Sequence, residues 1–157
     1  MARRREAPVR NVMPDTVYGS ELISKFINQV MVSGKKSVAE SIVYGALDIL
    51  SREVTDTQLA DVFEKVLDNA RPLVEVKSRR VGGATYQVPI EVSMSRGRTL
   101  AMKWLKTGAS ARREKSMYER LGREMVEAYH GRGAAVKKRD DSHKMADANK
   151  AFAHFRW

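Results

Sequence analysis

The side chains best suited to chemistry in this chain of 157 residues are arginines and lysines that occur in groups. One group opens the chain, a second follows a glycine between two helical patterns, and a third precedes a pair of glycines. The groups are Arg3, Arg4, Arg5 and Arg10; Lys35 and Lys36; and Lys77, Arg79 and Arg80. Guanidinium and ammonium groups bind phosphate oxygens, and several such contacts give a protein its affinity for nucleic acid. The pattern therefore predicts binding to a polyanion.

The charge of the whole chain supports that prediction. Lys and Arg number 29 against 19 Asp and Glu, which gives a net charge of +10. Residues 71–123 hold thirteen basic and four acidic residues, whereas residues 11–70 hold five basic and nine acidic ones. A chain that needed charge only for solubility would scatter its lysines. The concentration favours a dedicated anion-binding surface over a generic solvated face.

An acidic membrane would also attract a basic protein, but the sequence lacks a segment that could enter one. No stretch approaches the roughly 20 apolar residues that span a bilayer. The basic start is followed by Glu6 and Pro8 rather than by the apolar core of a signal peptide. We therefore expect a soluble, cytoplasmic protein with no membrane partner.

The residues that commonly carry catalysis or hold metals form no working pattern. The chain has no cysteine, which excludes thiolate zinc sites, disulfides and cysteine nucleophiles. His130, His143 and His154 lack the spacing of metal ligands. Asp141-Ser142-His143 resembles a catalytic triad only in its letters, and Ser142 is better interpreted as a helix cap. We expect no catalytic residue, no metal and no small-molecule substrate.

Two glycine-containing segments resemble nucleotide-binding loops, and each lacks a required residue. In Gly34-Lys35-Lys36-Ser37, Gln29 stands where a phosphate loop needs its first glycine. In Gly131-Arg132-Gly133, Val136 stands at the third glycine position of a dinucleotide fingerprint, and the segment follows a helix. Both are better interpreted as turns between helices, so we expect no cofactor.

The hydrophobic pattern shows which elements must position the basic groups. Apolar residues recur at helical spacing in six segments. Ser20 is a candidate cap of the first helix. Capping boxes at Ser37/Glu40 and Ser116/Glu119 are expected to open the second and fifth helices. The expected helices cover about residues 20–32, 37–50, 57–70, 99–107, 116–130 and 137–152. The sequence predicts a mainly α fold, a single domain over 1–157 of about six helices with one protruding basic β-hairpin between the third and fourth helices. We expect a basic extended tail over 1–15, a β-ribbon arm over 73–92, and a C-terminal helix and tail over 137–157.

The hairpin is the most distinctive element. Gly82-Gly83 supplies the two positive-φ positions of a tight turn. That turn pairs Val81 with Ala84, Arg80 with Thr85, Arg79 with Tyr86 and Lys77 with Val88. Nine residues per strand make a ribbon on the order of 30 Å long, and we expect its outer half to leave the domain. An isolated ribbon is marginally stable, so an anionic partner would complete it, with Tyr86 stacked on a base. In the alternative, Tyr86 only shields the hairpin backbone and the arginines keep it soluble.

Three motifs identify a family resemblance: GKKS over residues 34–37, RRVGGATYQVPIEV over 79–92, and AVKKRDDSHKMADANKAFAHFRW over 135–157. Together with the MARRREAP start, they resemble small-subunit ribosomal protein seven of the bacterial type. The resemblance implies a helical bundle with a protruding β-ribbon. It implies a primary binder of small-subunit ribosomal RNA that nucleates assembly of the head. It also implies a place near the exit-site transfer RNA and contacts with small-subunit ribosomal proteins nine and eleven.

At positions that match the family's motifs, the resemblance implies that three basic groups contact ribosomal RNA. They are Arg3, Arg4, Arg5 and Arg10; Lys35 and Lys36; and Lys77, Arg79 and Arg80. The ribbon tip at Gly82 and Gly83, together with Arg79 and Tyr86, would lie near the exit-site transfer RNA. Segments 93–98 and 108–113 depart from the family pattern, which usually has more arginine and a proline in the first of them. Basic residues in and around these segments are further predicted RNA contacts: Arg96, Arg98, Lys103, Arg113 and Lys115.

Two other functions fit part of the pattern. An architectural DNA-binding protein also uses a basic β-ribbon on a helical body to grip duplex DNA. Such arms are usually paired, and this chain shows no evident dimerisation stripe, which favours RNA. A nuclease would need an acidic metal-binding cluster, and none is convincing. The sequence therefore favours a ribosomal RNA-binding protein with no catalytic activity.

Overall fold

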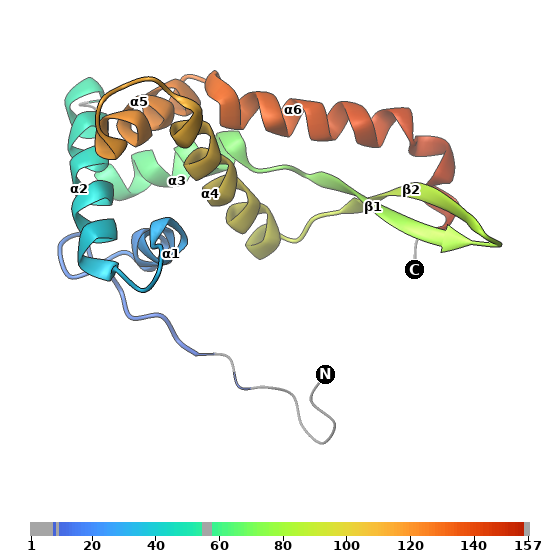
Figure 1. Ribbon diagram of the computed structural model, residues 1–157, viewed down its shortest axis with the longest axis horizontal. Coiled ribbons are helices and arrows are strands. Elements are labelled where there is room, and N and C mark those ends of the chain that lie inside the picture. Colours follow the sequence, from blue (N-terminus) through green and yellow to red (C-terminus); the bar gives the residue numbers. More distant parts are fainter. Residues whose placement is uncertain (1–7, 9, 55–57, 156–157) are drawn as a thin grey trace.

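The computed structural model describes residues 8, 10–54 and 58–155, so the predicted tail contacts Arg3, Arg4 and Arg5 lie outside the described part. The described residues form six α-helices, one two-stranded antiparallel sheet and a final 3-10 helix, η1 (Figure 1). In chain order these are α1 (Glu21–Val30), α2 (Lys36–Glu53), α3 (Leu59–Ala70), β1 (Val74–Val81), β2 (Ala84–Glu91), α4 (Met94–Ala111), α5 (Met117–Tyr129), α6 (Gly133–Ala148) and η1 (Lys150–Phe155). The mainly α fold with one hairpin between the third and fourth helices is confirmed.

The core forms because the helices carry apolar stripes at helical spacing. In α1 the stripe consists of Ile23, Phe26, Ile27 and Val30, and all four are buried. Phe26 meets Phe63 of α3 with ring centroids 5.2 Å apart. These side chains belong to one hydrophobic cluster that includes α2, α4, α5 and the start of α6. The cluster holds the bundle from which the basic elements extend.

Helices α2 and α5 share the largest interhelical contact, and glycine allows their close approach. A Cβ atom at Gly122 of α5 would lie 2.9 Å from the side chain of Ile49 on α2. Gly45 of α2 lies against Tyr118 of α5, where a Cβ would come within 3.2 Å of the ring. A larger residue at Gly122 would push the two helices apart.

The hairpin has the register that its glycine pair predicts. Val81 pairs with Ala84, Arg79 with Tyr86 and Lys77 with Val88. Gly82 and Gly83 adopt φ values of 57° and 90°, which L side chains rarely adopt. Each strand has eight residues rather than the nine expected.

The ribbon extends away from the helical bundle, as expected, but it is accompanied by the C-terminal part of the chain. Figure 1 shows α6 running alongside the strands and η1 folding back onto them. Val88 is fully buried beneath this cover, and the ring of Tyr86 contacts that of Phe152 in η1. The outer half therefore leaves the bundle as expected, and residues of the same chain cover one side of it.

Two predicted caps at the start of the chain do not form. Ser20 occupies the position before α1, but its side chain makes no capping hydrogen bond. Helix α2 begins at Lys36, so Ser37 lies inside it, and Glu40 pairs with Lys36 Nζ at 3.7 Å. The reason is the tight turn through Ser33 (φ 53°) and Gly34 (φ 74°), after which the helix starts at once. The Ser37/Glu40 capping box is therefore wrong.

Two later helices start earlier than predicted. Helix α4 begins at Met94 because Ser93 Oγ accepts the backbone N–H of Arg96 at 3.4 Å. Helix α6 begins at Gly133, and Ser142 lies within it, where its hydroxyl donates to the carbonyl of Lys138 at 2.9 Å. Ser142 is thus not a helix cap. At the start of α5, by contrast, Ser116 N–H donates to Glu119 at 3.3 Å, which is the glutamate half of the predicted capping box.

Candidate nucleic-acid interface

The turn between α1 and α2 presents two exposed lysines at the first turn of a helix. Lys35 immediately precedes α2 and Lys36 begins it. Cations there oppose the helix dipole, and the N–H groups of a helix N-terminus favour an anion. The exposed pair of Lys36 with Glu40 is weak competition for a phosphate. This arrangement is unfavourable for an isolated helix and favourable for phosphate binding.

The segment before α1 is anchored to α2 through a buried carboxylate. Tyr44 Oη donates to Asp15 Oδ1 at 2.6 Å, and the N–H groups of Val17 and Tyr18 donate to Oδ2 at 3.1 and 3.0 Å. Burial alone would raise the pKa of Asp15, but these hydrogen bonds, assisted by the charge of Lys36, hold that pKa below its ordinary value. These contacts fix the position of the segment that leads back to the exposed Arg10.

Helix α4 carries a second set of cations. Arg96 and Lys103 are exposed and stand seven residues apart, so they share one face of the helix. Arg96 Nη2 lies 3.3 Å from Glu75 of β1. Arg98 is half-buried and pairs with Glu64 of α3. Of these three predicted contacts, Lys103 and Arg96 are the more accessible to a large anion.

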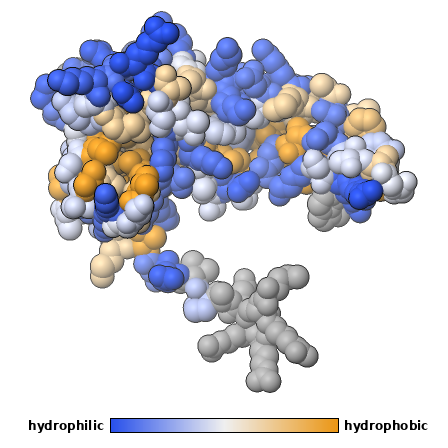
Figure 2. Space-filling view, in the orientation of Figure 1, coloured by the Kyte–Doolittle hydropathy of each residue, from blue (hydrophilic) through white to orange (hydrophobic). Residues whose placement is uncertain are grey.

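The ribbon presents its cations on β1. Lys77 and Arg80 are exposed, whereas Arg79 and Tyr86 are half-buried. Lys77 Nζ lies 3.3 Å from Glu75, which also pairs with Arg96. Glu75 thus brings the base of the ribbon and the start of α4 together. Figure 2 shows hydrophilic side chains over much of the face in view and an apolar area over α1.

The loop between α4 and α5 lies apart from the other groups. Arg113 and Lys115 are exposed there, beyond the C-terminal end of α4. Arg96 and Arg113 are separated by roughly 25 Å of helical rise. The predicted RNA contacts therefore do not form one compact patch; the loop can reach only a separate part of an extended partner.

That loop is positioned by residues that sequence reasoning missed. Arg112 pairs with Glu114 at 2.9 Å and with Glu124 and Glu127 at 3.1 Å each, and the hydrogen bond to Glu127 is the largest influence that raises its pKa. Glu124 is 1% exposed and also accepts the N–H of Ala135 at the start of α6 at 2.9 Å. The network joins α4, α5 and α6. In the sequence, a glutamate at a position of a helix where apolar residues are expected is the signal that could have revealed this network.

Neither a candidate metal site nor a candidate membrane-spanning helix occurs among the described residues. No group of three or more His, Cys, Asp or Glu side chains among residues 8, 10–54 and 58–155 is placed to hold a metal ion. None of the helices in that part of the chain has the length and apolar character needed to cross a bilayer.

Comparison with known proteins decides the family. The family model described as Ribosomal protein S7p/S5e matches residues 2–150. The chain belongs to this family. The protein named small ribosomal subunit protein uS7 from Francisella tularensis subsp. holarctica (strain OSU18) is 57% identical over 157 residues, covering all of both chains. Proteins of the same name from subsp. novicida (strain U112) and subsp. mediasiatica (strain FSC147) are each 56% identical, again over the whole of both chains.

Family membership confirms the resemblance found in the three sequence motifs. The chain is a structural, non-enzymatic constituent of the small ribosomal subunit. It is an RNA-binding component of a ribonucleoprotein that acts in translation in the cytoplasm.

Proposed function

We propose that this chain is a primary binder of small-subunit ribosomal RNA that nucleates assembly of the subunit head and lies near the exit-site transfer RNA. The observation that carries the proposal is the distribution of exposed cations over several rigid elements. Lys36 on α2, Lys77 on β1 and Lys103 on α4 are all exposed. Contacts spread in this way suit a folded RNA that presents phosphates at several separated points.

Rigid placement explains how such a protein could nucleate RNA folding. Side chains on helices and a covered ribbon are held at fixed separations before RNA arrives, which lowers the entropic cost of binding. An RNA whose helices meet at a junction gains most from a partner that fixes their relative positions. Phosphate contacts supply affinity, while RNA shape supplies selectivity.

The residues proposed to contact ribosomal RNA are those named from the sequence. They are Arg3, Arg4, Arg5, Arg10, Lys35, Lys36, Lys77, Arg79, Arg80, Arg96, Arg98, Lys103, Arg113 and Lys115. Arg79, Gly82, Gly83 and Tyr86 are proposed to lie near the transfer RNA. Small-subunit proteins nine and eleven are the proposed protein neighbours. In this proposal the whole chain acts as one RNA-binding domain with its tail, ribbon arm and C-terminal segment.

Architectural binding of duplex DNA is the alternative. The basic ribbon fits that function equally well. Membership in a ribosomal protein family weighs against it, as does the cover that α6 and η1 place over one side of the ribbon.

Chemical footprinting on protein-free small-subunit ribosomal RNA tests the proposal. With this chain as the only protein, we expect protections confined to the head portion of the RNA. Adding the other head proteins afterwards should extend those protections without moving them. If protections appear only after another small-subunit protein has bound, the chain is a late binder and the nucleating role is wrong.

A further inference from the structure

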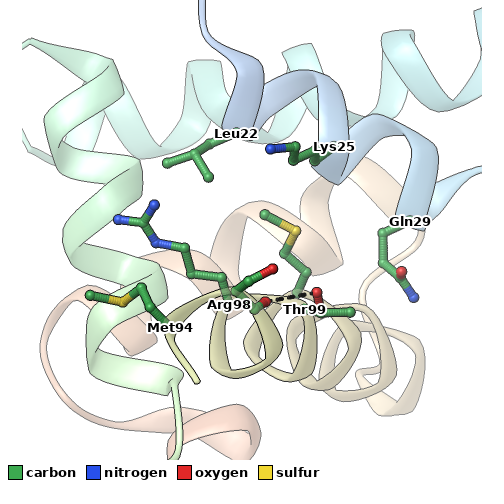
Figure 3. Close-up of a pocket in the computed structure, with 8 residues that line it drawn as sticks. Leu22, Lys25, Gln29, Met94, Arg98 and Thr99 are labelled. Atoms are coloured by element: carbon green, nitrogen blue, oxygen red, sulfur yellow. Dashed lines mark hydrogen bonds between the residues drawn. The ribbon is translucent and has the colours of Figure 1, made fainter. Parts of the chain in front are cut away.

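A cavity lies between α1 and α4, and its lining includes Arg98, one of the proposed RNA contacts. Its volume is about 470 Å³, and the described residues that form its walls belong to these two helices (Figure 3). One part of the wall is apolar and consists of Leu22, Met94 and Met102. Lys25 and Arg98 supply cations on opposite walls. The volume lies within the about 300–1,000 Å³ typical of small-ligand sites.

We propose that this cavity takes a single unstacked nucleotide of the bound RNA. The base lies against Leu22, Met94 and Met102, and the phosphate lies between Lys25 and Arg98. The inference rests on the proposed RNA-binding function and deepens it by assigning a base-accepting site. Single-stranded RNA is commonly bound through splayed bases held against protein side chains.

The electrostatics of the cavity favour an anion. Among the residues that the structure describes, none with an acidic side chain lines the cavity. Glu21 and Glu64 pair with Lys25 and Arg98 from outside it, and both glutamates are substantially exposed. The Lys25–Glu21 pair is exposed on both sides and exchanges partners at little cost, whereas Arg98 is half-buried and keeps Glu64 on its Nη2. Among the described atoms, Nε of Arg98 is buried and has no hydrogen-bond partner, so this guanidinium carries an unsatisfied donor.

The apolar wall favours a flat, polarisable ring over a bare phosphate. Met94 is 50% exposed and lines the cavity, so its side chain is accessible to a ligand there. Methionine adapts its shape to aromatic rings and makes favourable sulfur contacts with them. An aromatic side chain of a neighbouring protein would use this wall but would bring no negative charge to Lys25 and Arg98. A nucleotide satisfies both halves of the cavity.

The cavity is held open before any ligand binds. At one end, Lys106 Nζ of α4 donates to the carbonyl oxygen of Gln29 on α1 at 2.9 Å. At the other end, the Arg98–Glu64 pair ties α4 to α3. These two cross-links fix the position of α4, so a base can enter without separating the helices.

Methyl NMR of the full chain tests the proposal. The protein is labelled with ¹³C at methionine methyl groups and bound to the head portion of small-subunit ribosomal RNA. A base in the cavity should move the Met94 and Met102 signals upfield through its ring current, whereas Met145 on α6 should stay unchanged. If RNA binds and neither cavity signal moves, the assignment is wrong. It is equally wrong if the signals move only when a neighbouring ribosomal protein is added.

A blocking variant gives a second readout. Thr99 is exposed and lines the cavity, so Thr99→Trp should fill it and weaken RNA binding at least tenfold. The matched control is Thr107→Trp, two turns along α4, where the threonine is also exposed and also donates to the carbonyl four residues earlier. Lys25→Gln should weaken binding and reduce the salt slope by about one unit. Equal RNA affinity of the two tryptophan variants would overturn the proposal.

If the wild-type chain does not bind ribosomal RNA, the proposed function is wrong. If the wild-type chain binds and the Met94 and Met102 signals and the Thr99→Trp affinity are unchanged, only the nucleotide cavity is wrong.

Discussion

The ring of Tyr86 on β2 lies 5.3 Å from the ring of Phe152 in η1, and their planes are inclined by 51°. The two residues are far apart in sequence, and their contact ties the outer half of the ribbon to the C-terminal segment. A two-stranded ribbon is marginally stable in water unless it packs on something else. Phe152 supplies part of that packing within the chain, so the ribbon does not depend on RNA alone for order.

Replacing Phe152 should therefore loosen the ribbon without disturbing the bundle. An aromatic pair contributes about 0.5–1.5 kcal/mol. In Phe152→Ala we expect hydrogen exchange of the β2 amides to accelerate by up to about tenfold, with unchanged exchange in α2 and α5. Met145→Ala, which removes an exposed side chain on α6, is the control. Unaltered β2 exchange in Phe152→Ala would mean that the ribbon is stable without this contact.

The ribbon tip can be removed without opening the core. Deleting residues 79–86 and closing the strands with a short glycine-containing turn keeps Val88, which is fully buried. We expect the helical core to stay folded, RNA binding to weaken moderately, and retention of exit-site transfer RNA by assembled ribosomes to change. Phe152→Ala is the matched control, since it loses the same ring contact but keeps the tip. Wild-type retention of transfer RNA after the deletion would remove the proposed role of the tip.

Neutralising Lys35 and Lys36 should weaken RNA binding and leave the stability of the fold almost unchanged. In the double variant Lys35→Gln/Lys36→Gln we expect weaker RNA binding and a salt slope reduced by up to about two units. The free energy of unfolding should change by less than about 0.5 kcal/mol, because loss of the Lys36–Glu40 pair and relief at the α2 N-terminus oppose one another.

The control for this pair is Lys137→Gln/Lys144→Gln, which neutralises two exposed lysines on α6. It should leave the salt slope nearly unchanged. A marked loss of helix in the Lys35/Lys36 variant would show that the turn serves the fold rather than the RNA.

The Tyr44–Asp15 hydrogen bond gives a pH-dependent prediction. Because the pKa of Asp15 lies below its ordinary value of 3.8 in the folded chain, its contribution is complete above that value. The contribution is lost as pH falls through the folded-state pKa. Tyr44→Phe should lower the free energy of unfolding by about 1.5 kcal/mol at pH 7. The difference from wild type should shrink in acid, when Asp15 is protonated in both proteins.

Urea unfolding at neutral and acidic pH measures this effect. The control is Tyr118→Phe, because Tyr118 also donates to a carboxylate, that of Glu119 at 3.3 Å, but is exposed. That variant should change stability by only a few tenths of a kcal/mol. A Tyr44→Phe effect that persists undiminished in acid would show that Asp15 is not the source.

Local sequence patterns predicted the elements that local interactions determine. Gly82 and Gly83 fixed the hairpin register because only that turn places both at positive φ. Helix starts were less predictable. The Ser37/Glu40 pattern failed because the left-handed Ser33 starts α2 one residue early, and Ser93 opens α4 before the apolar stripe becomes visible.

Long-range contacts could not be predicted from the same patterns. The pairing of Arg112 with the buried Glu124, and the packing of Phe152 on Tyr86, depend on how α5, α6 and η1 fold back. The cavity between α1 and α4 likewise depends on how these two helices pack, with Lys106 donating to the Gln29 carbonyl across them. The basic groups were visible in the sequence. The distance that α4 places between Arg96 and Arg113, at opposite ends of the helix, was not.

The central claim is that this chain recognises ribosomal RNA, and an equilibrium competition tests it most directly. The full chain is bound to the head portion of small-subunit ribosomal RNA over a range of salt concentrations and challenged with duplex DNA of matched length. We expect affinity for the RNA to fall steeply with salt and the DNA to compete poorly, because phosphate contacts give strength and RNA shape gives selectivity. Equal affinity for the DNA would contradict the account.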